Sequence, residues 1–205
     1  MKVHNDLIME LPGFVPESFC KHIIEKFESD SRSKPGMIDY RGKSELSDYK
    51  QSIELSIPSV ADDGWGKEND MMLSYIKSAV DVYNKYLREE YKDGLFEPIL
   101  KNVDKNDIFV ENYCTIHKQK KQCGYVWHYD QIKKPASYLF GILYLHTIEP
   151  YGGETEFING RKIKAECGKI MLCPANWTYA HRGNRFKTKY KYIVAFYVLT
   201  DRLIS

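Results

Sequence analysis

Two histidines and one aspartate in the second half of the chain have the residue types of a metal site. His128 and Asp130 stand two positions apart in GYVWHYDQ, and residues with this spacing point to the same side of an extended strand. His181, in YAHRGN, follows much later and can supply a third ligand. Two histidines and a carboxylate on one face of an ion leave adjacent positions open, as in non-haem Fe(II) oxygenases. Zinc with three protein ligands and a water is the competing interpretation.

A lysine ten residues after His181 indicates a second component of such a site. Lys191 lies in YKYIVAFYVL, where a period of two places it on one face with Ile193, Ala195 and Tyr197. If this face points inward, the ammonium group is buried beside apolar groups and needs an anion as its partner. A dicarboxylate co-substrate would supply that anion, which favours an iron oxygenase over a hydrolytic zinc site.

The remaining histidines and the cysteines fit a ligand role less well. We expect His4, His22, His117 and His146 to be structural or surface residues that need no metal. The cysteines are odd in number and contain no Cys-x-x-Cys pair, so neither a disulfide framework nor a cysteine zinc site is expected. We expect reduced thiols in a cytoplasmic protein. The cysteines are Cys20, Cys114, Cys123, Cys167 and Cys173.

Composition and charge indicate a soluble globular protein. The 205 residues are 43% hydrophobic and 28% charged, and 30 basic against 28 acidic residues leave a formal charge of +2. This balance provides no broad electrostatic reason to expect nucleic acid or an anionic membrane as a partner. The chain has no run of about 18 apolar residues. Asp6 and Glu10 interrupt the N-terminal segment, so neither a secretory signal nor an anchor is expected there.

The elements that must position these residues change in character along the chain. Apolar residues recur at helical spacing over residues 16–29 and again over residues 69–91, which predicts two amphipathic helices. Residues 30–46 are polar and are expected to form a surface loop. From residue 107 onward, short segments rich in β-branched and aromatic residues alternate with turn signals, which predicts strands. These strands are IFVENYCTIH, SYLFGILYLH, GETEFI, GKIMLC and YKYIVAFYVL. The fold class is therefore α+β, with helices on one face of an antiparallel sandwich or barrel.

The segment from Tyr113 to Tyr197 resembles the Fe(II)- and 2-oxoglutarate-dependent dioxygenases, in particular their prolyl 4-hydroxylase-like branch. The matching pieces are GYVWHYD, LYLHTIEPYGGETEF, AHRGN and the lysine ten residues after the distal histidine. The resemblance implies a double-stranded β-helix, a jelly-roll or cupin-like barrel, over residues 107–200. Residues 1–106 would be mainly helical support with an N-terminal strand, and residues 1–205 would form a single domain.

The resemblance also implies roles for individual residues. The iron ligands would be His128, Asp130 and His181. The residues that bind 2-oxoglutarate would be Lys191, which pairs with its distal carboxylate, and Tyr113, Thr155 and Tyr144. Lys189, Arg182 and Arg185 are rival partners for the carboxylate, but the ten-residue spacing favours Lys191. Fe(II) would be the metal, 2-oxoglutarate and dioxygen the co-substrates, and ascorbate a further candidate cofactor. No catalytic residue beyond the metal ligands is expected.

The implied reaction is hydroxylation of an unactivated C–H bond, with formation of succinate and carbon dioxide. Asp130 favours hydroxylation, because related halogenases replace this carboxylate to make room for chloride. We expect a protein or peptide side chain as the substrate. Hydroxylation of a free amino acid or small metabolite is the alternative, since Ser137 stands where some peptidyl-prolyl hydroxylases have a basic residue. In another class, a catalytically silent metal-binding barrel would act as a binding module. The sequence leaves the oligomeric state open.

Overall fold

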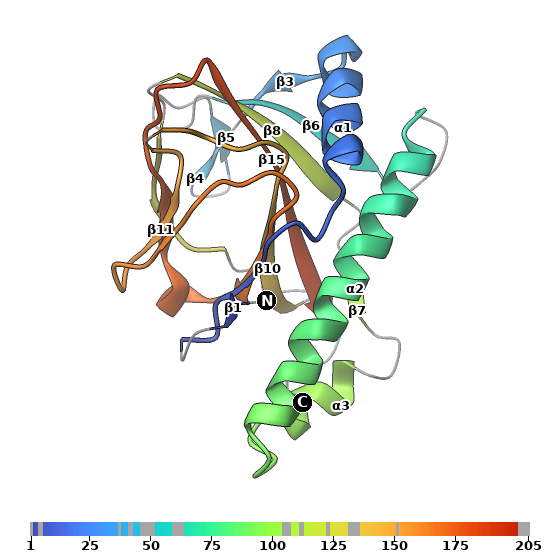
Figure 1. Ribbon diagram of the computed structural model, residues 1–205, viewed down its shortest axis with the longest axis vertical. Helices are drawn as coiled ribbons and strands as arrows, with labels where there is room; N and C mark the ends of the chain where they lie inside the picture. The colour runs from blue at the N-terminus through green and yellow to red at the C-terminus, as the bar shows by residue number, and fades with distance from the viewer. Residues whose placement is uncertain are drawn as a thin grey trace.

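The computed structural model describes residues 2–3, 6–36, 38–40, 43–45, 52–58, 64–103, 108–110, 113–121, 124–130, 136–150 and 152–200. These residues form two antiparallel sheets that face each other, with helices packed on the outer side of the larger sheet (Figure 1). This is the α+β double-stranded β-helix that the sequence predicts. The helices are α1 (Glu17–Ser29), α2 (Gly66–Glu90), α3 (Glu97–Val103) and the short 3-10 helix η2 (Trp177–Tyr179).

The two sheets divide the strands between a large and a small layer. In spatial order, the large sheet contains β1 (Lys2–Val3), β2 (Met9–Leu11), β13 (Ile170–Pro174), β10 (Ala136–Tyr144), β15 (Tyr190–Thr200), β8 (Tyr113–Lys120), β6 (Ser52–Pro58) and β3 (Lys34–Pro35). Another strand, β7 (Ile108–Val110), pairs with β15. The small sheet contains β12 (Lys162–Ile163), β11 (Thr155–Phe157), β14 (His181–Gly183) and β9 (Tyr125–His128). The hairpin of β4 (Ile38–Tyr40) and β5 (Lys43–Glu45) is separate from both.

The central strand β10 shows how the sequence builds two cores on one sheet. Leu139 and Leu143 pack with the helices, whereas Phe140, Ile142 and Tyr144 pack in the core between the sheets. Successive side chains of a strand point to opposite faces, so a strand buried on both sides has a nearly continuous apolar sequence. The segment SYLFGILY has this character.

A glycine in β10 leaves space for an aromatic ring of the neighbouring strand. Gly141 is the register partner of Phe196 on β15. A Cβ atom at Gly141 would lie 2.2 Å from the Phe196 ring, closer than two carbon atoms can approach. Phe196 has no exposed surface, so it could not move aside without disturbing the core under the helices.

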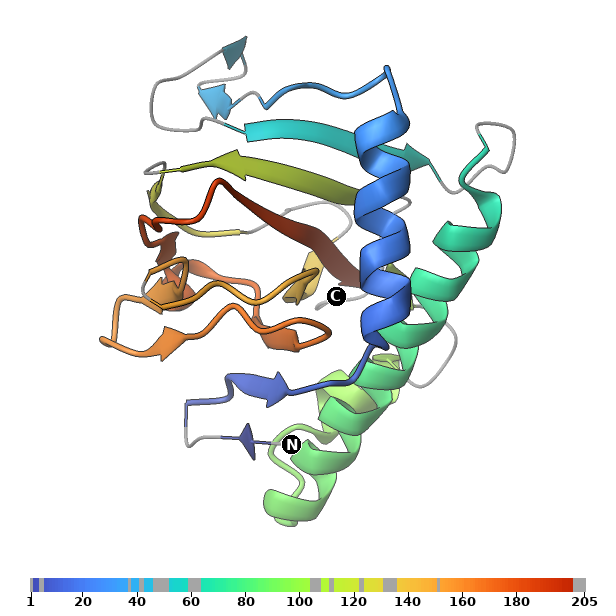
Figure 2. The same cartoon turned by 45° about the horizontal axis from the view of Figure 1, so that its top comes forward.

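The helices α1 and α2 both cover the outer face of the large sheet (Figure 2). Phe19, Ile23 and Phe27 recur at helical spacing on α1 and are buried. Burial of each such side chain stabilises the fold by roughly 1.5–3 kcal/mol. On α2 the predicted stripe of Met72, Tyr75, Ile76, Val80, Tyr83 and Leu87 packs against the core, with Tyr75 partly buried and the others buried. Both predicted helices are therefore present.

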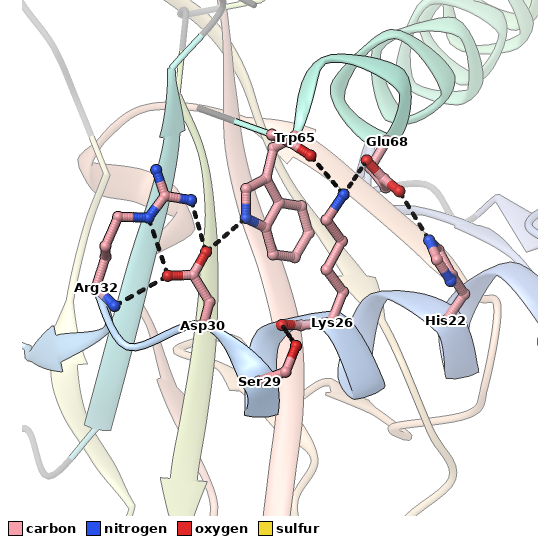
Figure 3. A network of polar contacts seen from close by, with 8 residues as sticks. His22, Lys26, Ser29, Asp30, Arg32, Trp65 and Glu68 are labelled. Atoms are coloured by element: carbon pink, nitrogen blue, oxygen red, sulfur yellow. Dashed lines mark hydrogen bonds and ion pairs between the residues drawn. The ribbon is translucent and has the colours of Figure 1, made fainter. Parts of the chain in front are cut away.

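Polar contacts join the end of α1 to the start of α2 (Figure 3). Glu68 accepts a hydrogen bond of 2.6 Å from Lys26 Nζ and lies 2.8 Å from His22 Nε2. Lys26 also donates to the Gly64 carbonyl, and its Nζ lies 4.9 Å from the centre of the Trp65 ring. Because Glu68 is buried, these contacts orient the two helices as well as satisfy its charge.

Several elements in the first half were not anticipated from the sequence. The strand β6 lies near one edge of the large sheet, and β3, β4 and β5 lie in or near the segment predicted to be a loop. The segment SIELSIP of β6 alternates apolar and polar residues, which is a signal for a half-buried strand. Among the described residues, no helix combines the length and hydrophobicity needed to cross a bilayer.

Candidate active site

The three candidate metal ligands meet at the junction of β9 and β14. These strands are antiparallel, and His181 is the register partner of His128. Asp130 follows β9, and its Oδ2 atom lies 3.3 Å from His181 Nε2 and 3.6 Å from His128 Nε2. One ligand atom from each residue falls within 4.8 Å of the other two. The strand pairing therefore brings together residues that are far apart in the sequence.

Backbone contacts orient both imidazoles toward the carboxylate. His128 Nδ1 lies 2.8 Å from the Val126 carbonyl, and His181 Nδ1 lies 3.1 Å from the Tyr179 carbonyl. A carbonyl oxygen only accepts, so each Nδ1 carries the donated proton. In a neutral imidazole the lone pair is then on Nε2, the atom that faces Asp130. A hydrogen bond of this kind is the usual support for a metal-bound histidine.

The carboxylate oxygen between the histidines has no hydrogen bond within the described part of the chain. Asp130 Oδ2 is buried and unpartnered. A buried anion facing two imidazole lone pairs is unfavourable unless a cation lies between them. The geometry and donor chemistry thus fit a divalent metal ion.

A tyrosine on β15 holds the other carboxylate oxygen. The Tyr197 hydroxyl donates to Asp130 Oδ1 at 2.5 Å. This bond leaves Oδ2 directed at the histidines and fixes the orientation of the carboxylate. The sequence placed Tyr197 on the face of Lys191 but did not assign it to the site. Tyr197 lies at the end of that face, as the register partner of Phe140 on β10. Its place on the same face as Lys191 was the sequence feature that could have indicated its role in the site.

Lys191 lies in the same cavity as the candidate metal ligands and is only 2% exposed. Its Nζ donates to the Gly153 carbonyl at 2.6 Å and lies 5.6 Å from the centre of the Tyr144 ring. Burial lowers the pKa of Lys191 to about 8, and the Glu154 carboxylate opposes this shift. No described residue makes an ion pair with Lys191. The site can therefore hold an anion against a buried ammonium group.

The other predicted co-substrate residues differ in how they reach the cavity. Thr155 lines it, and Tyr144 lies behind Thr155, with 2.7 Å between the two hydroxyl oxygens. Tyr144 has no exposed surface, and burial raises the pKa of its hydroxyl. Tyr113 begins β8, but its side chain lies outside the described residues. Thr155 is placed for direct contact with a ligand, and Tyr144 for support of Thr155.

The rival cations do not line the cavity. Arg182 donates to Glu156 Oε2 at 2.8 and 2.9 Å, and its guanidinium carbon lies 4.7 Å from the centre of the Trp127 ring. Lys189 and Arg185 are exposed. Of Lys191 and its three rivals, only Lys191 lines the cavity that contains the candidate metal ligands.

The cavity itself has a volume of about 250 Å³ and lies between the two sheets. The predicted inward face of β15, from Lys191 to Tyr197, lines it along its length. Tyr125 closes it from β9, with its ring centre 4.2 Å from that of His128. A polar wall, defined as Glu54 and Ser56 of β6 with Thr115, His117 and Gln119 of β8, forms another side. The sequence predicts a structural or surface role for His117 and indicates no role for β6, so it does not reveal this wall.

The remaining histidines and cysteines behave largely as expected. His22 contacts Glu68, and His146 donates from Nε2 to the Tyr190 carbonyl. The cysteines of the described residues, Cys20, Cys114, Cys167 and Cys173, are free thiols. His4 and Cys123 lie outside the described residues.

No family model matches the sequence, and no curated protein matches it. Solved structures do match its fold. A viral collagen prolyl hydroxylase from Paramecium bursaria Chlorella virus-1 aligns over 97% of this chain and 98% of its own, with a TM-score of 0.64 and 16% identity. The fold is that of the prolyl 4-hydroxylase-like 2-oxoglutarate oxygenases.

Two further structures show what proteins of this fold hold. A prolyl hydroxylase from Trichoplax adhaerens, in complex with a hypoxia inducible factor peptide fragment, aligns over 96% of this chain and 85% of its own, with a TM-score of 0.67 and 13% identity. HygX from Streptomyces hygroscopicus, with nickel and 2-oxoglutarate bound, aligns over 98% of this chain and 88% of its own, with a TM-score of 0.57 and 10% identity. The prolyl 4-hydroxylase-like fold of this chain thus covers nearly its whole length.

Proposed function

We propose that the protein is an Fe(II)- and 2-oxoglutarate-dependent dioxygenase that hydroxylates an unactivated C–H bond and forms succinate and carbon dioxide. The observation that carries this proposal is the shared cavity, in which the group of His128, Asp130 and His181 lies with the buried ammonium of Lys191. A hydrolytic zinc site would need the three ligands but has no use for the lysine. A dicarboxylate co-substrate gives the lysine a partner.

Different residues of this chain would bind the metal and the co-substrate. His128 Nε2, His181 Nε2 and Asp130 Oδ2 would hold Fe(II), and Lys191 with Thr155 would bind the distal carboxylate of 2-oxoglutarate. When bound, the iron and 2-oxoglutarate supply the oxidising chemistry with dioxygen. The protein orients these groups and excludes water with apolar side chains such as Ile142 and Ile193, which line the cavity. The Tyr197 hydroxyl holds the non-ligating oxygen of Asp130.

A peptide side chain is the substrate class that we propose. The Trichoplax adhaerens enzyme of the same fold is solved with a peptide fragment. In this chain, the segment of β9 that carries His128 also has exposed apolar and aromatic side chains outside the cavity lining, at Val126, Trp127 and the following Tyr129. Exposed apolar surface of this kind is typical of binding sites. A free amino acid or small metabolite would contact only the cavity and would leave this exposed surface unused.

Succinate formation from 2-oxoglutarate tests the proposed function. Wild-type protein reconstituted with Fe(II) under air should form succinate even without a primary substrate. His128→Ala and Asp130→Ala should abolish this turnover because each removes a metal ligand. His22→Ala, on α1, is the matched control and should retain it. A wild-type protein that binds Fe(II) and 2-oxoglutarate but forms no succinate would instead be a catalytically silent barrel.

A further inference from the structure

The polar wall lies beside the part of the cavity that the co-substrate would occupy. Glu54 is the register partner of His117, which is in turn the partner of Ile193 on β15. Adjacent strands lie about 4.8 Å apart, so β6 is roughly 10 Å from β15 across the sheet. Gln119 of the wall is the register partner of Lys191, whereas Glu54 lies one strand farther away, level with Ile193. Lys191 and Glu54 therefore occupy separate positions along one cavity.

Several contacts hold the Glu54 carboxylate in place on this wall. Glu54 Oε1 lies 2.7 Å from His117 Nδ1 and accepts a hydrogen bond of 2.6 Å from Ser52 Oγ. The Glu54 side chain is only 16% exposed. A Cβ atom at Gly36 would lie 2.4 Å from Glu54 Oε1, so the glycine leaves the space that the carboxylate occupies. The carboxylate thus has a defined position at the cavity wall.

Glu54 and the candidate metal ligands line the cavity from the two facing sheets. Glu54 belongs to β6 of the large sheet, whereas His128 belongs to β9 of the small sheet, where Tyr125 meets its ring edge to face. A group bound at the metal site and a group bound at Glu54 would therefore share one cavity.

The charges of Lys191 and Glu54 are opposite, so they suit two different ligands. The metal ligands and Lys191 suit a dianion such as 2-oxoglutarate. Glu54 would repel that dianion and would attract a cation placed in the same cavity. His117 lies on one side of the carboxylate, and the cavity lies on another.

We propose that Glu54 is a specificity-determining residue that receives a positively charged nitrogen, an ammonium or a guanidinium group, of the primary substrate. His117 and Ser52 position its carboxylate for this contact. The inference rests on the proposed function, because it places the C–H bond to be hydroxylated at the metal site while the cation lies on Glu54. The nitrogen would be the side-chain nitrogen of a lysine or arginine, either within a peptide or as the free amino acid.

A set of matched compounds tests this inference. The cationic members are free lysine, free arginine and blocked tripeptides with either residue at the centre. The neutral members have norleucine or citrulline in the same places, so that only the side-chain charge is removed. At equal concentrations below saturation, at least one cationic compound should stimulate succinate formation about 10-fold more than its neutral analogue, as expected for one charge-assisted hydrogen bond. Stimulation by the tripeptides alone indicates a peptide substrate, and stimulation by the free amino acids alone indicates a metabolite.

Variants of Glu54 separate charge recognition from a structural role. In Glu54→Gln the stimulation by cationic compounds, relative to the rate of the same variant without substrate, should fall by about 10-fold. Glu54→Lys should turn the preference toward compounds with an acidic side chain, which loss of fold would not do. Glu89→Gln, an exposed glutamate on α2, is the matched control and should keep the wild-type stimulation.

A binding measurement tests the role of Glu54 without requiring succinate formation. Calorimetric titration of the protein loaded with Zn(II) and 2-oxoglutarate, a form without oxidative activity, should show binding of the cationic compound that Glu54→Gln weakens about 10-fold. Equal binding of neutral analogues, no binding of any cationic compound, or unchanged binding in Glu54→Gln would overturn the inference. Cation binding that depends on Glu54 in a protein without succinate formation would overturn the proposed function and retain this site.

Discussion

At the scale of single residues, the buried lysine is the feature that suits the cavity to an anionic ligand. An ammonium group that is 2% exposed and has no anionic partner among the described residues is costly in the free protein. Burial lowers its pKa to about 8, from an ordinary value of 10.5. A bound carboxylate removes this cost, so binding of 2-oxoglutarate and protonation of Lys191 favour each other.

The pH dependence of co-substrate binding follows from this coupling. Below pH 8 Lys191 is charged in the free protein, so the dissociation constant of 2-oxoglutarate should be nearly constant. As the pH rises above 8, the free protein loses the proton and the dissociation constant should increase. Calorimetric titration from pH 7 to pH 9.5 measures this change. Identical constants at both ends would mean that Lys191 does not bind the anion.

Removal of the lysine provides the corresponding mutational prediction. Lys191→Ala should raise the concentration of 2-oxoglutarate needed for half-maximal succinate formation by roughly 10- to 100-fold, because a charge-assisted contact of about 1.5–3 kcal/mol is lost. The rate at saturating 2-oxoglutarate should change less. Lys189→Ala removes an exposed lysine immediately before the same strand and should behave like wild type.

The hydroxyl of Tyr197 should affect the metal rather than the co-substrate. Tyr197→Phe removes the hydrogen bond to Asp130 Oδ1 and frees the carboxylate to rotate. Loss of such a supporting bond typically weakens metal affinity about 10- to 100-fold. Competition for Mn(II) with a fluorescent chelator measures this affinity. Tyr75→Phe, on α2, is the control, and equal Mn(II) affinity in both variants would exclude a positioning role for Tyr197.

At the scale of elements, a helix, strand or site residue can be predicted when the sequence pattern that indicates it lies within one segment. The two helices and the strand β15 have clear periods within one segment, so the sequence predicts them and the inward face that carries Lys191. The group of His128, Asp130 and His181 follows from residue type and from spacing within the resemblance. Glu54 and His117 escape prediction because their pairing is a long-range register between β6 and β8, and no local pattern contains it.

The contact between α1 and α2 depends on the charge of Glu68. Burial would raise the pKa of Glu68, but hydrogen bonds from His22 and Lys26 lower it to about 2, from an ordinary 4.5. A carboxyl with a lowered folded-state pKa contributes stability above its unfolded pKa, and the contribution is lost as the pH falls toward the folded value. The window for this loss is pH 4.5 to about 2.

Glu68→Gln should therefore be less stable than wild type at neutral pH but not in strong acid. We expect the free energy of unfolding in urea to fall by about 1–2 kcal/mol at pH 7, because the contacts are partly exposed to solvent. The difference from wild type should shrink as the pH falls from 4.5 toward 2. Glu89→Gln should show little change at either pH, and a Glu68→Gln deficit that is constant with pH would contradict the ionic origin.

At the scale of the whole molecule, the helices stabilise one face of the large sheet and leave its other face to the cavity. The candidate metal ligands lie on the small sheet or directly after its strand β9, while Lys191 and the polar wall belong to the large sheet. Ligands that bind in the cavity therefore connect the two layers. This arrangement separates the structural core from the site.

Metal binding should consequently stabilise the folded protein. A divalent ion at 100 times its dissociation constant adds about 2.7 kcal/mol if it binds only the folded state. Mn(II) should raise the midpoint of thermal unfolding of the wild type but not of His181→Ala. His22→Ala should have a lower midpoint without Mn(II) and should keep the full increase with it. An equal increase in His181→Ala would place the metal elsewhere.

The origin of the oxygen in succinate tests the central claim most directly. Hydroxylation coupled to decarboxylation of 2-oxoglutarate places one atom of dioxygen in the product and the other in succinate. Wild-type protein with Fe(II) and 2-oxoglutarate under ¹⁸O₂ should therefore form succinate with one ¹⁸O atom, and Asp130→Ala should form none. Absence of succinate, or succinate without the label, from wild-type protein shown to bind both Fe(II) and 2-oxoglutarate would contradict the account.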